Sequence, residues 1–314
     1  MAVLRAARET VLDWLLAGDV SIQYQTRRDL LDEERPDLRA RIAREGWGRR
    51  FLEARNSDGS WGRGFYQPKW TSSHYTLLDL KALQIDPGHP VPQESIRRIA
   101  DTHKGADGGI NPSRTVEQSD VCVNGMFLSY ACYFGLEEKE LRSVVDYVLG
   151  ERMADGGFNC ERIRPGAHHS SLHSSISVAE GILEYERCGY RYRLDELREA
   201  ARSIRAFVLR HRLFRSDRTG EIIHRDMLRL SFPCRWKYDI LRGLEHFRDA
   251  EAPWDEAMSD ALEVLRGKRR RDGSWPLGAR HPGRTHFDME RAGQPSRWNT
   301  LRALRVLRFY GSDA

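Results

Sequence analysis

The sequence lacks any apolar run long enough to cross a membrane, because no stretch approaches the ~20 residues that a membrane helix needs. Its first residues, MAVLRAARETVLDWLL, mix Arg, Glu and Asp into the apolar positions, unlike a signal peptide. The alternation of apolar and polar residues that marks strands is almost absent as well. We therefore expect a helical, cytoplasmic protein without a transmembrane segment.

Paired cysteines and concentrated positive charge are also missing. The five cysteines are odd in number and include no Cys-x-x-Cys pair, so they do not predict a disulfide framework. The net charge of +5 comes from basic and acidic residues that are interleaved along the chain. The sequence has no compact basic block with spaced aromatics, which is the pattern that would suggest a nucleic-acid partner. The composition, 40% hydrophobic and 31% charged over 314 residues, is that of a globular protein with a large core.

A short turn motif recurs several times along the chain. The letters DGSW at residues 58–61 return at residues 272–275, DGG occurs at 107–109 and 155–157, and a degenerate copy ends at Gly220. Such spacing, roughly 50 to 60 residues, is typical of repeats built from helical pairs. Asp and Gly permit a tight reversal at positive φ, so these Asp residues are expected to be structural. Between the turns, apolar residues recur at i, i+3, i+4 and i+7, which predicts helices.

A second element accompanies the turns. Three segments place Pro, a cation and Trp just before an apolar helix, where Pro is well tolerated. The pairs of cation and aromatic are Lys69 with Trp70, Arg235 with Trp236, and Arg297 with Trp298. Residues 23–30 can be aligned with residues 297–304 and supply a sixth unit, with Tyr24 in the place of Trp298.

Six helix pairs can bury their apolar faces by closing into a ring, with inner helices around a central cavity and outer helices behind them. We therefore predict an all-α fold, an α/α toroid of six helical hairpins. Residues 1–314 form a single domain in this interpretation, with repeats that start near residues 20, 56, 105, 153, 217 and 270.

These turns and helices resemble the repeats of the terpenoid cyclase and protein prenyltransferase superfamily, whose fold is an α/α toroid. The resemblance covers roughly residues 20 to 310. Neither the Asp-x-Asp-Asp acid of squalene-cyclase-type enzymes nor an Asp-Asp-x-x-Asp motif is present, and the chain is too short for their two barrels. It is closer in size to a protein prenyltransferase β subunit, a single toroid that holds zinc through Asp, Cys and His.

The resemblance implies that Asp120, Cys122 and His173 bind Zn²⁺. A carboxylate, a thiolate and an imidazole leave one tetrahedral position open, which is the layout of catalytic zinc. Each residue also has a structural interpretation: Asp120 as a helix N-cap, Cys122 as a small buried residue and His173 as a core histidine. Reserve ligands nearby are His168, His169 and Cys160.

The same resemblance implies a diphosphate site at Arg114. The position three before Asp120, a Lys in that family, is Glu117 here, and an acid would repel a diphosphate. The cations that precede the Trp residues could compensate in the cavity, or could lie over the Trp faces at the surface; they are Lys69, Arg235 and Arg297. The aromatics at the same helix starts could hold an isoprenoid chain, stack on a sugar or belong to the core; they are Trp70, Trp236 and Trp298.

The late loop adds two carboxylates, Asp288 and Glu290, which could act as acid and base or simply be solvated. Together these features predict an isoprenoid-handling enzyme that transfers a prenyl group, with zinc and a prenyl diphosphate in the central cavity. Two alternatives stay open. One is a non-catalytic toroid that binds a lipid or peptide, and the other is a carbohydrate-active barrel that uses Asp288, Glu290 or Asp239. Because protein prenyltransferases need a helical α subunit, an unidentified protein partner is also possible.

Overall fold

The computed structural model describes residues 10–113, 115–161, 166–278 and 280–311. Over these residues the fold is all-α except for one small antiparallel sheet, in which β1 (Trp275–Pro276) pairs with β2 (Pro295–Ser296). The prediction of an all-α protein is thus confirmed. None of the helices described here is both long enough and apolar enough to span a bilayer.

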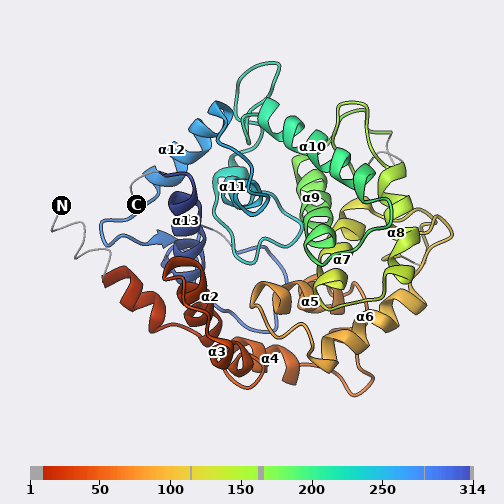
Figure 1. The fold of residues 1–314 in the computed structure, drawn as a ribbon, viewed down its shortest axis with the longest axis horizontal. Coiled ribbons are helices and arrows are strands. Elements are labelled where there is room, and N and C mark those ends of the chain that lie inside the picture. Colours follow the sequence, from red (N-terminus) through yellow and green to blue (C-terminus); the bar gives the residue numbers. More distant parts are fainter. Residues whose placement is uncertain (1–9, 114, 162–165, 279, 312–314) are drawn as a thin grey trace.

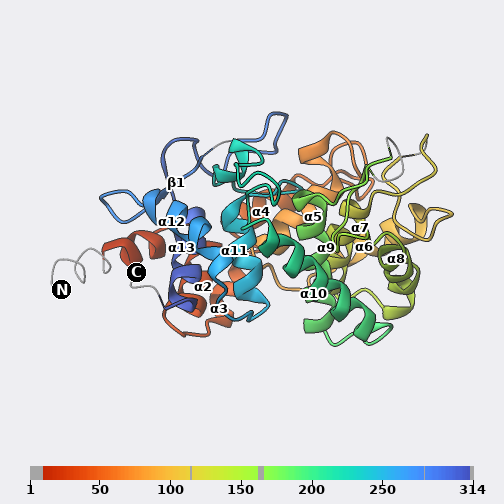
Figure 2. The ribbon, with the colours of Figure 1, turned by 90° about the horizontal axis from the view of Figure 1, so that it is seen from above.

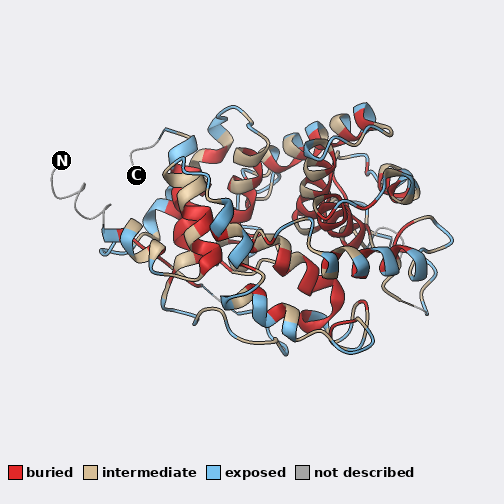
Figure 3. Ribbon diagram, turned by 60° about the horizontal axis from the view of Figure 1, so that its bottom comes forward, coloured by how far each residue is buried: buried red, intermediate tan, exposed pale blue. Residues whose placement is uncertain are grey.

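Two kinds of helix alternate along the chain. The first kind is buried around most of its circumference; in α7, for example, every residue except Cys122 and Tyr133 is buried. These helices are α2 (Val20–Leu30), α5 (Ser73–Ala82), α7 (Val121–Tyr133), α9 (Leu172–Arg187), α11 (Ile240–Asp249) and α13 (Arg297–Phe309). Figure 3 shows that buried residues gather on the helices near the middle of the molecule and exposed residues on those at its edge.

The second kind of helix is amphipathic and buries one face, as expected for helices that cover a core. α10, for example, buries Leu197, Ile204 and Val208 and packs against α9 (Figure 2). These helices are α3 (Pro36–Arg41), α4 (Gly46–Glu53), α6 (Pro90–Thr102), α8 (Glu138–Gly150), α10 (Leu194–Arg210) and α12 (Ser259–Gly267). Short 3₁₀ turns lie at Lys69–Thr71, Arg225–Leu228 and Glu256–Met258, and residues 10–16 are also helical.

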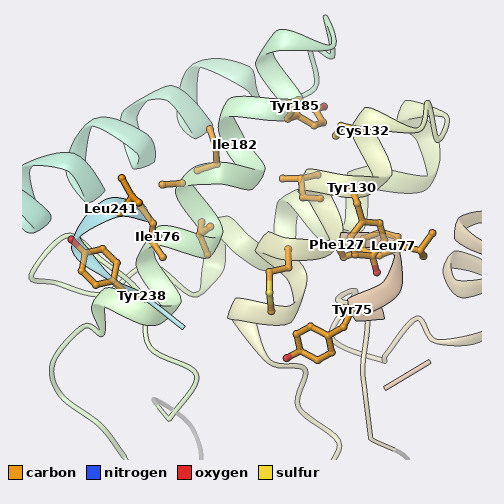
Figure 4. Packing of buried hydrophobic residues seen from close by; sticks show 14 of the residues in the cluster. Tyr75, Leu77, Phe127, Tyr130, Cys132, Ile176, Ile182, Tyr185, Tyr238 and Leu241 are labelled. Atoms are coloured by element: carbon orange, nitrogen blue, oxygen red, sulfur yellow. The ribbon is translucent and has the colours of Figure 1, made fainter. Parts of the chain in front are cut away.

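The buried helices contact one another in sequence order. α5 contacts α7, α7 contacts α9, α9 contacts α11, and α11 contacts α13, while α13 also contacts α2 (Figure 1). The closest pair is α7 and α9, where a Cβ on Gly181 would lie only 2.3 Å from the Gly125 carbonyl oxygen. Apolar side chains of α5, α7 and α9, such as Leu77, Phe127 and Ile182, fill the space between these helices (Figure 4).

The repeated turns have the geometry that the sequence predicts. Gly59, Gly108, Gly156 and Gly273 all adopt positive φ, between 80° and 97°. In the first of these turns the Asp58 carboxylate accepts the Ser60 N–H at 2.8 Å, and in the last the Asp272 carboxylate accepts the Ser274 N–H at 3.0 Å. The structural role expected for these Asp residues is confirmed, because their oxygens bond the turn itself.

Each turn is also anchored to the first part of a buried helix. The N–H of the residue two positions after the first turn glycine donates to a polar side chain of that helix, over 2.6 to 3.0 Å. The pairs are Trp61 with Ser73 of α5, Ile110 with Asn124 of α7, Phe158 with Ser175 of α9, and Trp275 with Thr300 of α13. The repeat therefore fixes where these four buried helices begin.

Candidate functional site

A cavity of about 1050 Å³ lies between the buried helices, and all six of them line it. On α9 the lining residues Glu180, Leu183, Glu184 and Arg187 recur every three or four positions, as one face of a helix requires. Lining residues at the C-terminal ends of α9 and α13 are exposed and mark the open mouth; they are Arg187, Arg308 and Phe309. The opposite end is closed by buried side chains that include Trp298.

The wall of this cavity is charged. Ion pairs between the cavity helices run around it, and most have short, direct contacts of 2.6 to 2.8 Å. The pairs are Arg242 with Glu180, Arg302 with Glu245, Lys81 with Glu184, and Arg305 with Asp29. These bonds satisfy charges that burial would otherwise penalise.

The apolar periodicity of the helices concealed this charged wall in the sequence. In α13, Arg302 and Arg305 are only 4% and 8% exposed, although the helix reads as apolar by its Leu and Val residues. The available signal was the three-residue spacing of charged residues inside helices that are otherwise apolar, as with Arg242 and Glu245 in α11. That spacing places the charges on one stripe, which here faces the cavity.

One pair in the cavity differs from the others. The Arg235 guanidinium lies 3.8 Å from the Asp79 carboxylate, without a hydrogen bond, although the two side chains are only 6% and 3% exposed. Within the described residues, Asp79 Oδ2 and the Nε and Nη1 atoms of Arg235 have no hydrogen-bond partner. The guanidinium stacks instead on the Trp70 ring, 4.6 Å from its centroid. Both Asp79 and Arg235 line the cavity.

Burial sets the ionisation of this pair. It raises the pKa of Asp79 from 3.8 to about 6, although the positive charge of Arg235 acts in the opposite direction. Burial also lowers the pKa of Arg235. His246, on the same cavity wall, has neither ring nitrogen bonded to any described residue, and burial lowers its pKa to about 4, so it is neutral at pH 7.

The residues predicted to bind zinc are not arranged as a metal site. The sulfur of Cys160 accepts the Cys122 N–H at 3.2 Å, and Asp120 precedes α7 in the N-cap position. His173 points elsewhere: its Nδ1 accepts the Tyr238 N–H at 2.7 Å. A neutral imidazole that accepts at Nδ1 carries its proton on Nε2, which leaves that nitrogen unable to ligate a metal.

Within the described part of the chain, no three His, Cys, Asp or Glu side chains are placed to hold a metal ion. The residues present therefore do not fit the predicted zinc centre. His168 and His169 are exposed, as expected for residues of a solvated loop.

The predicted cations lie in different surroundings. Arg235 faces the cavity, whereas Arg297 stacks on the Trp14 ring at 4.6 Å and donates to its carbonyl oxygen at 2.9 Å. The Lys69 ammonium lies 5.3 Å from the Trp236 ring centroid. Arg114 lies outside the described residues. Only Arg235 of the three described cations therefore lines the large cavity.

The three Trp residues at the helix starts do not gather in one cluster. The Trp70 indole donates to the Pro282 carbonyl at 2.6 Å, beneath the late loop. Trp298 lines the cavity and stacks on Phe232 with ring centroids 4.2 Å apart. Trp236 packs edge-on against His173 at 5.3 Å. Trp298 thus lines the large cavity, Trp70 lines the smaller hollow beneath the late loop, and Trp236 belongs to the surroundings of His173.

The carboxylates of the acid and base hypothesis have structural partners. Glu290 accepts the Arg297 N–H at 2.7 Å and so caps the start of α13, while Asp288 pairs with Arg280 at 2.7 Å on an exposed loop. Asp239 caps α11 by accepting the Arg242 N–H at 2.9 Å. Asp288 and Glu290 line a separate hollow of only about 40 Å³. The large cavity is lined by none of these three carboxylates.

Comparison with known proteins adds little to this geometry. No protein-family model and no curated protein matches the chain. A crystal structure of a protein from Actinoplanes is similar at 16% sequence identity, with 99% of each chain covered and a TM-score of 0.49. A similarity of this size supports no conclusion about function, so the site is interpreted from its own residues.

Proposed function

We propose that the chain is a single α/α toroid of six helical hairpins whose central cavity binds a small polar molecule with an anionic group. Arg235 contacts the anion, and Asp79 exchanges a proton with the bound molecule. Two observations support the toroid: six helices line one cavity, and α13, the last of them, contacts α2, the first.

The atoms of Asp79 and Arg235 that lack hydrogen bonds carry the proposal. Buried polar atoms without hydrogen bonds cost free energy, typically ~1 to 3 kcal/mol each. A ligand oxygen placed beside Arg235 would recover that cost, and the planar guanidinium suits a carboxylate or phosphate group. A carboxyl group with a pKa of about 6 can both hold and release a proton near neutral pH.

The charged wall favours a polar ligand over an isoprenoid chain. Pockets for apolar ligands are lined mainly by apolar and aromatic side chains, whereas arginines and carboxylates from all sides line this cavity. Prenyl transfer with zinc therefore stays a prediction from the resemblance alone. A toroid that binds without catalysis would share the anion site but would not depend on the proton of Asp79.

Thermal unfolding with defined probes tests the proposal. The probes are inorganic diphosphate, citrate, farnesyl diphosphate and cellobiose, added to the whole chain. We expect diphosphate or citrate to raise the Tm by about 4 °C or more at a concentration a hundredfold above Kd. Arg235→Gln should abolish the shift. Arg297→Gln is the matched control, because Arg297 also precedes a Trp but lies on Trp14 outside the cavity, and it should keep the shift.

The Asp79→Asn variant also changes the cavity wall but keeps Arg235, so it distinguishes loss of the anion contact from general damage to the cavity. At pH 7.5 the Asp79 carboxylate is largely ionised and repels an anion beside Arg235, so the Asn variant should bind diphosphate more tightly. A shift that persists in Arg235→Gln would contradict the proposed site. A shift with farnesyl diphosphate and none with inorganic diphosphate or citrate would instead support the isoprenoid prediction. Native mass spectrometry of the purified protein would show which molecule it carries.

A further inference from the structure

Two cysteines from adjacent repeats meet at the starts of α7 and α9. Cys122 lies in the first turn of α7, and Cys160 follows the turn at residues 155–157. The Cys160 sulfur accepts the Cys122 N–H at 3.2 Å and the Ser174 hydroxyl at 3.4 Å. The Cys122 thiol also interacts with it, side chain to side chain. Both cysteines have intermediate exposure, whereas Cys132 is buried.

The surroundings of Cys160 favour a reactive sulfur. Hydrogen-bond donors at helix N-termini stabilise a thiolate, and the thiolate is the nucleophilic form of cysteine. The Asp120 carboxylate next to Cys122 acts against this, but three donors face the Cys160 sulfur directly. The other cysteines differ: Cys132 is buried, Cys188 is exposed beside Glu184, and the Cys234 thiol donates to the Ser231 carbonyl.

We propose that Cys160 and Cys122 form a reversible dithiol and disulfide pair that responds to a hydroperoxide. The Cys160 thiolate attacks one oxygen of hydrogen peroxide, the O–O bond breaks, and hydroxide leaves, so that a sulfenic acid forms on Cys160. The Cys122 sulfur then attacks the Cys160 sulfur, the S–O bond breaks, and water leaves with the thiol proton. Two thiols have lost two electrons in total, and the peroxide has been reduced to two molecules of water.

The disulfide would join the start of α7 to the segment that precedes α9. The structure already holds these segments together, since the Cys122 N–H of α7 donates to the Cys160 sulfur at 3.2 Å. The pair is independent of the Asp79 and Arg235 site, so either proposal can fail without the other.

Peroxide treatment of the whole chain followed by peptide mass spectrometry tests the pair. We expect wild-type protein to lose two of its five free thiols, to yield a peptide linked through Cys122 and Cys160, and to recover both thiols with dithiothreitol. In Cys122→Ser the reaction should stop at a sulfenic acid on Cys160, trapped by dimedone about tenfold faster than any label on Cys188. Cys160→Ser should lose this fast reaction.

Cys188→Ser is the control, because Cys188 is the exposed cysteine of the chain and its loss should leave the linked peptide unchanged. Circular dichroism and Tm of each variant show whether it is folded. A wild-type protein that keeps all five thiols, or that oxidises first at Cys188, would overturn the proposal. So would a disulfide that contains only one of the two proposed cysteines.

Discussion

At the scale of single residues, Asp79 stands apart from the other carboxylates of the cavity. Glu180 and Asp29 each accept a hydrogen bond from a cation, and such bonds favour the ionised form. Asp79 has only the more distant charge of Arg235, so burial dominates and raises its pKa to about 6. A buried carboxyl that is kept from its partner is costly to the fold, which is the usual mark of a functional residue.

The raised pKa of Asp79 makes a prediction about stability. Between pH 3.8 and about 6 the folded protein holds a proton on Asp79 that the unfolded chain has released. The free energy of unfolding therefore falls as pH rises through this window, by about 3 kcal/mol in total. Asp79→Asn cannot ionise and should lack this loss, so it should gain about that much over wild type between pH 4 and pH 7. Guanidinium unfolding at several pH values measures the difference, and parallel curves for the two proteins would contradict the assignment.

At the scale of elements, the late loop is tied to the start of α13. Glu290 accepts the N–H groups of Arg297 and Trp298 at 2.7 and 3.3 Å and also bonds the Ser296 hydroxyl. The first N–H groups of a helix have no partner within it, so a carboxylate there supplies what the helix lacks. Glu290 is thereby a helix cap supplied by a neighbouring loop.

Glu290→Ala should consequently lower the free energy of unfolding by about 1 to 2 kcal/mol, because it leaves these donors unpaired. Asp288→Ala is the matched control on the same loop. Its ion pair with Arg280 is about half exposed, so its loss should cost less than about 1 kcal/mol. Chemical denaturation of both variants measures the two values. Equal losses, or a variant of Glu290 as stable as wild type, would remove the capping role.

The elements also show what could be predicted from the sequence. The turns were predictable because the Asp side chain bonds the backbone only two residues further along, so the turn is set by adjacent residues. Helix ends such as Gly135 and Gly189 likewise adopt the positive φ expected of C-terminal caps. The partners of His173 and Arg297 were not predictable in this way. Their positions depend on the Tyr238 N–H and on Trp14, which are distant in sequence and carry no pattern that links them. Zinc binding by Asp120, Cys122 and His173 stays a prediction from the resemblance, for which the described residues offer no fitting arrangement.

At the scale of the whole molecule, the first and last of the cavity helices are held together by buried charge. Arg305 of α13 pairs with Asp29 of α2 and donates to Gln25 at 2.8 Å. The Arg305 side chain is 9% exposed, and burial lowers its pKa. Three residues on, Arg308 makes the corresponding contact with Asp32 at 2.5 Å, but there the side chains are 39% and 74% exposed.

These two arginines offer a test of how the cavity is closed. Arg305→Met would leave the half-buried Asp29 carboxylate with Arg28 as its remaining ion-pair partner among the described residues, and removal of one member of a largely buried pair typically costs about 3 kcal/mol. Arg308→Met removes an exposed pair and should cost less than about 1 kcal/mol.

If the α2 and α13 contact closes a toroid, Arg305→Met should lower the Tm of the entire chain in a single transition, because every cavity helix loses its neighbours together. Calorimetry and hydrogen exchange would show this directly. Early exchange confined to α2 and α13, with the remaining helices still protected, would mean instead that the ends of the chain associate without closing a cooperative ring.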